Sequence, residues 1–109
     1  MDLKALRDKP ARFVIGLMSG TSCDGIDAAL VRIRGTGRSL HLKYMHFMTH
    51  PYDTAFRNRL LSTRLSAHEV CLLNFELGRR FAEAVVEMKR YAEREGTPVD
   101  FVASHGHTV

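Results

Sequence analysis

The 109-residue sequence is poor in the features on which disulfide-rich, zinc-binding and membrane-spanning proteins depend. It has only two cysteines, Cys23 and Cys71, which are too few for a disulfide scaffold and lack metal-ligand spacing. This cysteine content favours a reducing compartment, so we expect a cytoplasmic protein. Residues 1–12 mix acidic and basic side chains without a continuous apolar stretch, which predicts neither a signal peptide nor a membrane span.

Neither sign of charge dominates the sequence. The sequence has 16 basic and 12 acidic residues, a formal net charge of +4, and the basic residues form no block. Nucleic-acid-binding surfaces typically combine basic runs with interleaved aromatic residues, and this combination is missing. We therefore expect no nucleic-acid partner and no membrane partner, and the mild basicity suits a small anionic ligand.

The most informative stretch is the loop at residues 18–27, Met-Ser-Gly-Thr-Ser-Cys-Asp-Gly-Ile-Asp, which separates two apolar runs. Its glycines, Gly20 and Gly25, can adopt positive φ and let the backbone approach a ligand closely. Successive backbone N–H groups in such a turn form a concave cluster of donors, which binds anions such as phosphate. Further donors are the hydroxyls of Ser19, Thr21 and Ser22.

Two carboxylates in this loop allow more than one interpretation. Asp24 and Asp27 would repel a phosphate, so they indicate either a bridging Mg²⁺ ion or a turn-capping role. The whole loop can also be a simple hairpin turn. It is not a P-loop, because it lacks the Gly-Lys-Ser/Thr ending, and it is not a dinucleotide fingerprint, because the third glycine and the following helix are absent.

The first half of the sequence predicts three consecutive strands. Residues 13–18 form a short apolar run typical of a buried strand, and residues 27–34 and 40–49 continue as extended segments separated by turn residues. Tight connections favour an antiparallel meander. The third strand is expected to place one set of side chains on a single face, namely Leu40, Leu42, Tyr44, His46 and Met48. Residues 1–11 are expected to be a flexible leader.

After Pro51 the apolar period changes from two to about 3.6, which is typical of helices. Asp53 is a candidate N-cap for a short helix, and Ser66 with Glu69 forms a capping-box pattern that begins a long one. The long helix has one apolar stripe and is expected to end near Glu95. Its stripe comprises Val70, Leu73, Leu77, Phe81, Ala84, Met88 and Tyr91.

A last strand is expected at residues 99–103, followed by a loop at residues 104–109. Because two helices precede it, this strand can return parallel to the first one, which gives a mixed α/β sheet. The loops at residues 19–27 and 104–108 would then open at the same edge of the sheet.

The second loop contains two imidazoles, His105 and His107, separated by Gly106. Two histidines at this spacing can share a metal ion, but the sequence groups no further ligands nearby. Cys23 has no basic partner beside it in sequence, which favours a small uncharged filler over a nucleophile.

Three segments together resemble one family. Residues 16–27, Gly-Leu-Met-Ser-Gly-Thr-Ser-Cys-Asp-Gly-Ile-Asp, closely resemble the amino-terminal signature of the bacterial anhydro-N-acetylmuramic acid kinases. Residues 104–109, Ser-His-Gly-His-Thr-Val, resemble the family's later His-Gly-Gln-Thr-Val segment, and residues 75–82 resemble its Leu-Gly-Arg-containing helix. The resemblance extends from about Phe13 to the end of the chain.

This resemblance implies a ribonuclease-H-like fold of the actin and hexokinase ATPase superfamily, of which residues 12–109 would be the N-terminal part of a kinase lobe. It implies an ATP-dependent enzyme that opens a 1,6-anhydro sugar with water while phosphorylating O6, giving N-acetylmuramate 6-phosphate in peptidoglycan recycling. Asp24 and Asp27 become candidate Mg²⁺ ligands. The implied ATP phosphate loop is Gly20, Thr21, Ser22, Cys23, Asp24, Gly25, Ile26 and Asp27. The implied substrate-site candidates are His105, Gly106, His107 and Thr108.

The sequence departs from the family pattern at two positions: His107 replaces the usual Gln, and Cys23 replaces the common Leu or Met. Superfamily relatives such as hexokinase and actin begin their phosphate loop with an Asp, where this sequence has Met18. Asp24 or Asp27 is then expected to supply the missing carboxylate.

Family members are several times longer than this chain. We therefore expect the general-base Asp, the adenosine pocket and a C-terminal lobe beyond Val109, no catalytic residue within the chain, and no turnover by the chain alone. A homodimer is also possible. The alternatives are a non-catalytic ribonuclease-H-like binding module and another sugar or acyl kinase of the same superfamily.

Overall fold

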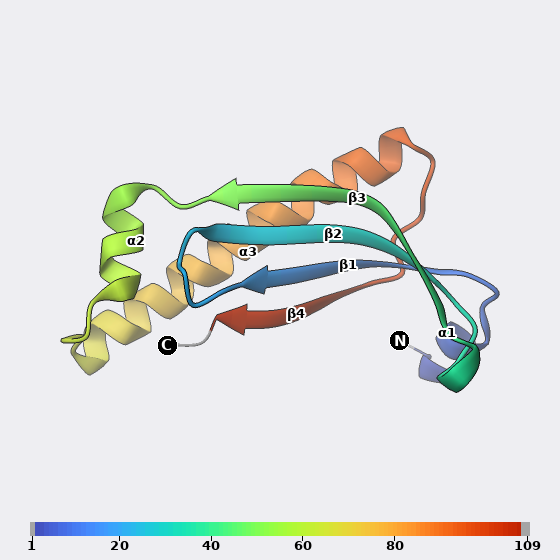
Figure 1. Cartoon of the computed structure of the whole chain (residues 1–109), viewed down its shortest axis with the longest axis horizontal. Helices are drawn as coiled ribbons and strands as arrows, with labels where there is room; N and C mark the ends of the chain where they lie inside the picture. Colours follow the sequence, from blue (N-terminus) through green and yellow to red (C-terminus); the bar gives the residue numbers. More distant parts are fainter. Residues whose placement is uncertain (1, 108–109) are drawn as a thin grey trace.

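The structure, a computed structural model, describes residues 2–107. A four-stranded sheet with the strand order β3-β2-β1-β4 forms its centre, and the long helix α3 crosses one face of that sheet (Figure 1). Thr108, one of the predicted substrate-site residues, lies outside the described residues. The elements in chain order are α1 (Leu3–Asp8), β1 (Arg12–Ser19), β2 (Gly25–Arg34), β3 (His41–Pro51), α2 (Thr54–Leu61), α3 (Ala67–Arg94) and β4 (Phe101–His107), with a 3₁₀ turn at Gly37–Ser39.

The predicted topology is confirmed. Strands β1, β2 and β3 form an antiparallel meander, and β4 pairs parallel with β1 after the crossover through α2 and α3. This is an α/β fold with a mostly antiparallel mixed sheet, as expected for part of an actin-like ATPase fold. None of the helices within residues 2–107 combines the length and the apolar character needed to cross a membrane.

The core lies between the sheet and α3. Alternate residues of β1 and β2 point to this side, and Ile15, Ile26 and Leu30 are almost completely buried there. Ala84 and Met88 of α3 meet them and are fully buried. The apolar stripe predicted for the helix is therefore largely confirmed, although its first member, Val70, is 45 % exposed.

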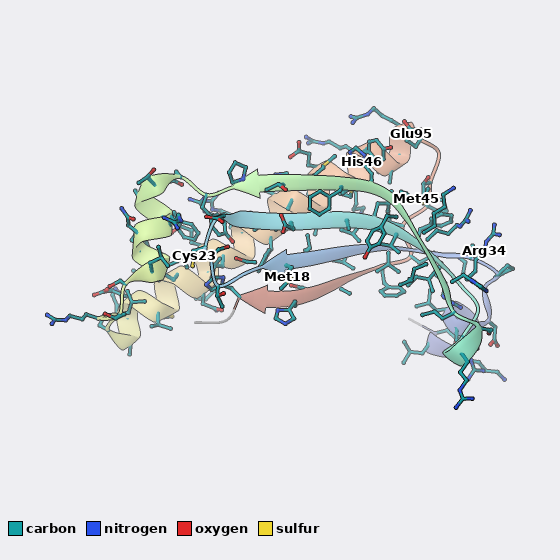
Figure 2. The ribbon with its side chains drawn as sticks, in the orientation of Figure 1. Met18, Cys23, Arg34, Met45, His46 and Glu95 are labelled. Carbon is teal, nitrogen blue, oxygen red and sulfur yellow. The ribbon has the colours of Figure 1, made fainter. Side chains whose placement is uncertain are left out.

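Strand β3 corrects the prediction that Leu40, Leu42, Tyr44, His46 and Met48 share one face. The pairing with β2 shifts between Leu30 and Val31, which leaves Met45 as an extra residue in β3. Such a bulge reverses the alternation of side chains along the strand. His46 consequently stacks on Tyr91 of α3, whereas Tyr44 is 75 % exposed on the opposite side of the sheet. Figure 2 shows Met45 and His46 at neighbouring positions of β3.

The sheet face opposite α3, here called the open face, is rich in exposed apolar side chains. Met18, Tyr44 and Phe47 are 49 %, 75 % and 59 % exposed. They flank a shallow groove that also includes Ala29, Val31 and Ala103. A continuous apolar patch of this kind on a sheet typically marks an interaction surface.

Strand β4 corrects a second prediction. It begins at Phe101 and continues to His107, so the Ser-His-Gly-His segment belongs to the strand and not to a loop after it. Its pairing with β1 is irregular here, because Leu17 is opposite Ser104 while Ser19 is opposite His107. Gly106 has φ of 77°, which a glycine adopts without strain, and this allows the irregularity.

Residues 3–8 of the predicted flexible leader, residues 1–11, form helix α1, which the sequence did not predict. The Asp2 side chain caps this helix by accepting from the Lys4 and Ala5 N–H groups. The chain after the helix is attached to the sheet by an ion pair between Lys9 and Asp100. The buried Arg12 guanidinium donates to the carbonyls of the leader and of Gly35. A helix of six residues is too short to give a periodic signal.

Candidate functional site

The two family-like segments meet at one end of the sheet. The loop between β1 and β2 lies beside the carboxyl end of β4, and His107 contacts both ends of that loop. His107 Nδ1 is 2.8 Å from Ser19 Oγ, and His107 Nε2 is 3.7 Å from Cys23 Sγ. Parallel pairing of β1 and β4 therefore brings the two segments together, as the sequence predicted. Figure 2 shows Cys23 at the end of the sheet near α2.

A buried hydrogen-bond network supports this loop from inside the protein. Ser19 is 2 % exposed, and its Oγ lies 2.8 Å from the Tyr52 hydroxyl as well as from His107. Burial raises the pKa of Tyr52 above its ordinary value, against a smaller opposing effect of the bond to Ser19. Tyr52 is therefore a neutral phenol at neutral pH. Sequence reasoning missed Tyr52, because its contact with Ser19 joins positions 33 residues apart.

The backbone of the loop differs from the expectation. Neither Gly20 nor Gly25 has positive φ; the residue in the left-handed region is Cys23, with φ of 55°. The Cys23 N–H donates to the Gly20 carbonyl at 3.1 Å and closes a tight turn. Gly25 is required for a different reason, because a Cβ there would lie 2.4 Å from the His50 carbonyl oxygen.

The donors available to a ligand are also fewer than expected. The Ser19 hydroxyl is held in the buried network, which leaves Thr21 and Ser22 as the exposed hydroxyl residues of the loop. The space around Gly20 is open, because an added Cβ would meet only Ser22 Oγ, at 3.9 Å. An anion can therefore approach the loop backbone closely at Gly20.

Helix α2 brings a cation to the loop. The Arg57 guanidinium donates to the Ser22 carbonyl at 3.3 Å, and its Nε lies 3.4 Å from Asp24 Oδ1. Both side chains are partly or largely exposed, so this pair contributes at most about 1 kcal/mol to stability. Its importance is electrostatic, because it places a positive charge next to the exposed loop. The sequence carried no signal for this contact.

A second cluster of charges helps to hold α2, and with it Arg57, in place beside the buried Phe56 and Leu60. Asp53 caps α2 as predicted, accepting from the Phe56 N–H at 3.0 Å. Arg80 of α3 binds both Asp53 and Glu76 and stacks 3.9 Å above the Phe56 ring. The bond from the Phe56 N–H and the pairing with Arg80 lower the pKa of Asp53. The N-cap predicted at Ser66 is likewise confirmed.

The candidate metal ligands are not gathered at one point. Asp24 pairs with Arg57, whereas Asp27 accepts from Thr49 at 3.1 Å and borders the open face. His105 also borders the open face, so it does not share a ligand position with His107. Across residues 2–107, no three His, Cys, Asp or Glu side chains converge on a common point.

A groove of about 410 Å³ separates the loop from the α2–α3 connection. Thr21, Cys23 and His107 form one side of it, and Leu61, Thr63 and Val70 lie on the other side. The groove is large enough for a phosphate-sized group and gives a ligand access to the loop.

The mixed sheet and its helices form an α/β fold consistent with part of an actin-like ATPase domain. Comparison with known proteins makes this assignment specific: the sequence model of the family described as anhydro-N-acetylmuramic acid kinase matches residues 12–109. The chain belongs to this family.

Individual relatives have the same name. The chain is 35 % identical to the anhydro-N-acetylmuramic acid kinase of Caldanaerobacter subterraneus subsp. tengcongensis over 98 % of its length. It is 42 % identical to that of Bacillus cereus strain Q1 and 43 % identical to that of strain B4264, in each case over 89 % of its length. The matched regions make up 28 %, 26 % and 26 % of these relatives, so the chain spans about a quarter of their length.

Proposed function

We propose that residues 12–109 are the N-terminal, ATP-phosphate-binding part of a cytoplasmic 1,6-anhydro-N-acetylmuramate kinase. The observation that carries the proposal is the meeting of an exposed, hydroxyl-bearing loop with the end of a parallel strand, next to the cation of Arg57. Ligands of α/β proteins typically bind at the carboxyl ends of parallel strands. The proposed phosphate-binding segment comprises the loop residues Gly20, Thr21, Ser22, Cys23 and Asp24 and the first residues of β2, Gly25, Ile26 and Asp27.

Within this proposal the loop contributes electrostatic stabilisation and positioning, which are the main requirements of phosphoryl transfer. Backbone N–H groups near Gly20 and the hydroxyls of Thr21 and Ser22 would hold phosphate oxygens. Mg²⁺ would neutralise charge on the phosphates, and Asp24 is the candidate ligand beside the loop, whereas Asp27 accepts from Thr49 and borders the open face. Arg57, which pairs with Asp24 in this structure, would then be available to the nucleotide.

The reaction proposed for the whole enzyme is opening of the anhydro ring by water with phosphate transfer to O6 of the sugar. The product is N-acetylmuramate 6-phosphate, an intermediate of peptidoglycan recycling. The sugar-side candidates in this chain are His105, Gly106, His107 and Thr108. The general-base Asp, the adenosine pocket and the C-terminal lobe are expected in the part of the relatives that this chain does not match. We therefore expect the chain to bind nucleotide without turning over the sugar.

The open face supports a second candidate, a non-catalytic binding module. Met18, Tyr44 and Phe47 expose apolar surface that a partner protein, a kinase lobe or a second copy of the chain would cover. Another sugar or acyl kinase of the same superfamily is a third candidate, because these residues do not define the pocket for a particular sugar.

Calorimetric titration with Mg²⁺-ATP tests the proposal. Gly20→Val adds branches where the space is open, so it is expected to fold normally and to abolish binding by blocking the loop. Gly78→Val is the matched control, because Gly78 is also uncrowded and lies on α3 away from the loop. Equal affinities of the wild-type chain and Gly20→Val would exclude the loop as the nucleotide site and favour the binding module.

A further inference from the structure

A thiol and an imidazole from distant parts of the chain lie in contact with each other. Cys23, from the β1–β2 loop, and His107, from β4, are 84 positions apart, and Cys23 Sγ lies 3.7 Å from His107 Nε2. The two residues also border the same groove. A thiol and an imidazole nitrogen are the preferred ligand types of Zn²⁺ and similar thiophilic ions.

The separation of the two atoms fits a shared metal ion. With Zn–S of about 2.3 Å and Zn–N of about 2.0–2.1 Å, an S···N separation like that of Cys23 and His107 corresponds to an angle at the metal of about 116°. This is close to the tetrahedral angle that zinc sites adopt. The distance between the two donor atoms therefore already suits a shared ion.

The imidazole is also held in the orientation that metal binding requires. In the tautomer that donates from Nδ1 to Ser19 Oγ, the Nε2 lone pair is free and faces Cys23. Ser19 can then donate to the neutral Tyr52 hydroxyl, which completes the chain of hydrogen bonds. Metal-binding histidines commonly donate their second ring N–H in this way, and the partner fixes the ring orientation.

We propose that Cys23 and His107 form a binding site for a thiophilic divalent cation, represented by Zn²⁺. The remaining coordination positions are filled by water from the groove of about 410 Å³ that both residues border. Binding replaces the S–H bond with a metal–sulfur bond and releases one proton to solvent. The proposal does not depend on nucleotide binding by the loop, and its test contains no nucleotide.

The test uses the full 109-residue chain with Cys71→Ser as the background, because Cys71 is exposed and would bind metal on its own. Cd²⁺ is the spectroscopic probe, since cadmium–thiolate bonds absorb in the ultraviolet, and Zn²⁺ competes for the same site. The expected result is one Cd²⁺ per chain, displaced by Zn²⁺, with about one proton released per ion. Circular dichroism confirms that every variant is folded.

Three variants in this background distinguish the site from chance binding. Cys23→Ala is expected to remove the ultraviolet band, and His107→Gln to weaken Cd²⁺ binding at least tenfold while the protein stays folded. Ser19→Ala keeps both ligands but removes the hydrogen bond that orients the His107 ring. The affinity for Cd²⁺ is expected to fall by about 10–100-fold, as is typical when such a partner is removed. The proposal would be overturned if His107→Gln bound Cd²⁺ with unchanged affinity, or if Cys23→Ala still gave the ultraviolet band of one Cd²⁺ per chain. It would also be overturned if the Cys71→Ser protein, with Cys23 and His107 intact, bound no Cd²⁺.

Discussion

Gly25 offers the sharpest test of how the loop is built. A Cβ at this position would lie 2.4 Å from the His50 carbonyl oxygen and 2.8 Å from Pro51 Cα. Both neighbours are backbone atoms, so the overlap cannot be relieved by rotating a side chain. Gly25 pairs with Pro51 at the end of the β2–β3 ladder, and the two strands must separate there to admit a methyl group.

The cost of Gly25→Ala follows from two contributions. Overpacking of a rigid site typically costs about 1–3 kcal/mol. Separation of the strands also threatens the adjacent hydrogen bond from the Tyr52 N–H to the Asp24 carbonyl, 2.9 Å long, and such a bond contributes about 0.5–1.5 kcal/mol. We therefore expect the free energy of unfolding to fall by about 2–4 kcal/mol.

Urea unfolding followed by circular dichroism measures this change, with Gly78→Ala as the control. Gly78 lies within α3, and an added Cβ there meets no atom within 4 Å. Alanine is the better helix former by up to about 1 kcal/mol, so the control is expected to stabilise the protein. If the free energies of unfolding of Gly25→Ala and wild type differ by less than about 0.5 kcal/mol, the inferred close contact between Gly25 and Pro51 is refuted.

Two further predictions concern buried polar groups. Ser19→Ala is expected to lower the free energy of unfolding by about 1–3 kcal/mol, because it leaves the buried Tyr52 hydroxyl and His107 Nδ1 without their partner. Ser39→Ala, at an exposed position, serves as the control. Equal losses of stability in the two variants would contradict the role of the network. For Asp100, burial raises the pKa, but the Lys9 ion pair and the Phe13 N–H bond outweigh it, so the net pKa in the folded protein is lowered. Its contribution to stability is therefore fully present above the unfolded pKa of about 3.9 and is lost as the pH falls through the lower folded value. The free energy of unfolding, measured from pH 2 to 6, is expected to fall less steeply with acid in Asp100→Asn than in wild type. An identical pH dependence in Asp100→Asn and wild type would refute this contribution of Asp100.

The secondary structure was predictable because its signals are local. The N-caps at Asp53 and Ser66, the apolar stripe of α3 and the buried runs of β1 and β2 are each encoded within a few consecutive residues. The order of the strands followed from the helical crossover before β4. Together these features were enough to predict at which end of the sheet the candidate site lies.

The sequence-based predictions were wrong where the conformation of one strand depends on its pairing with the next. The bulge at Met45 and the irregular pairing around Gly106 depend on the register between two strands, which no single segment encodes. The contacts between Ser19 and Tyr52 and between Arg57 and Asp24 join residues more than 30 positions apart. Their residue types are ordinary in their local context, so only the folded chain identifies them as parts of one site.

The structure also changes the explanation of the loop itself. Its glycines were expected to provide unusual backbone angles, yet the residue with positive φ is Cys23, a strained position for a side-chain-bearing residue. Such a conformation persists only where the surroundings hold it. Here the Gly20 carbonyl binds the Cys23 N–H, and His107, fixed by Ser19, contacts its sulfur. The shape of the loop therefore depends on the end of β4, which makes the two family-like segments one structural unit.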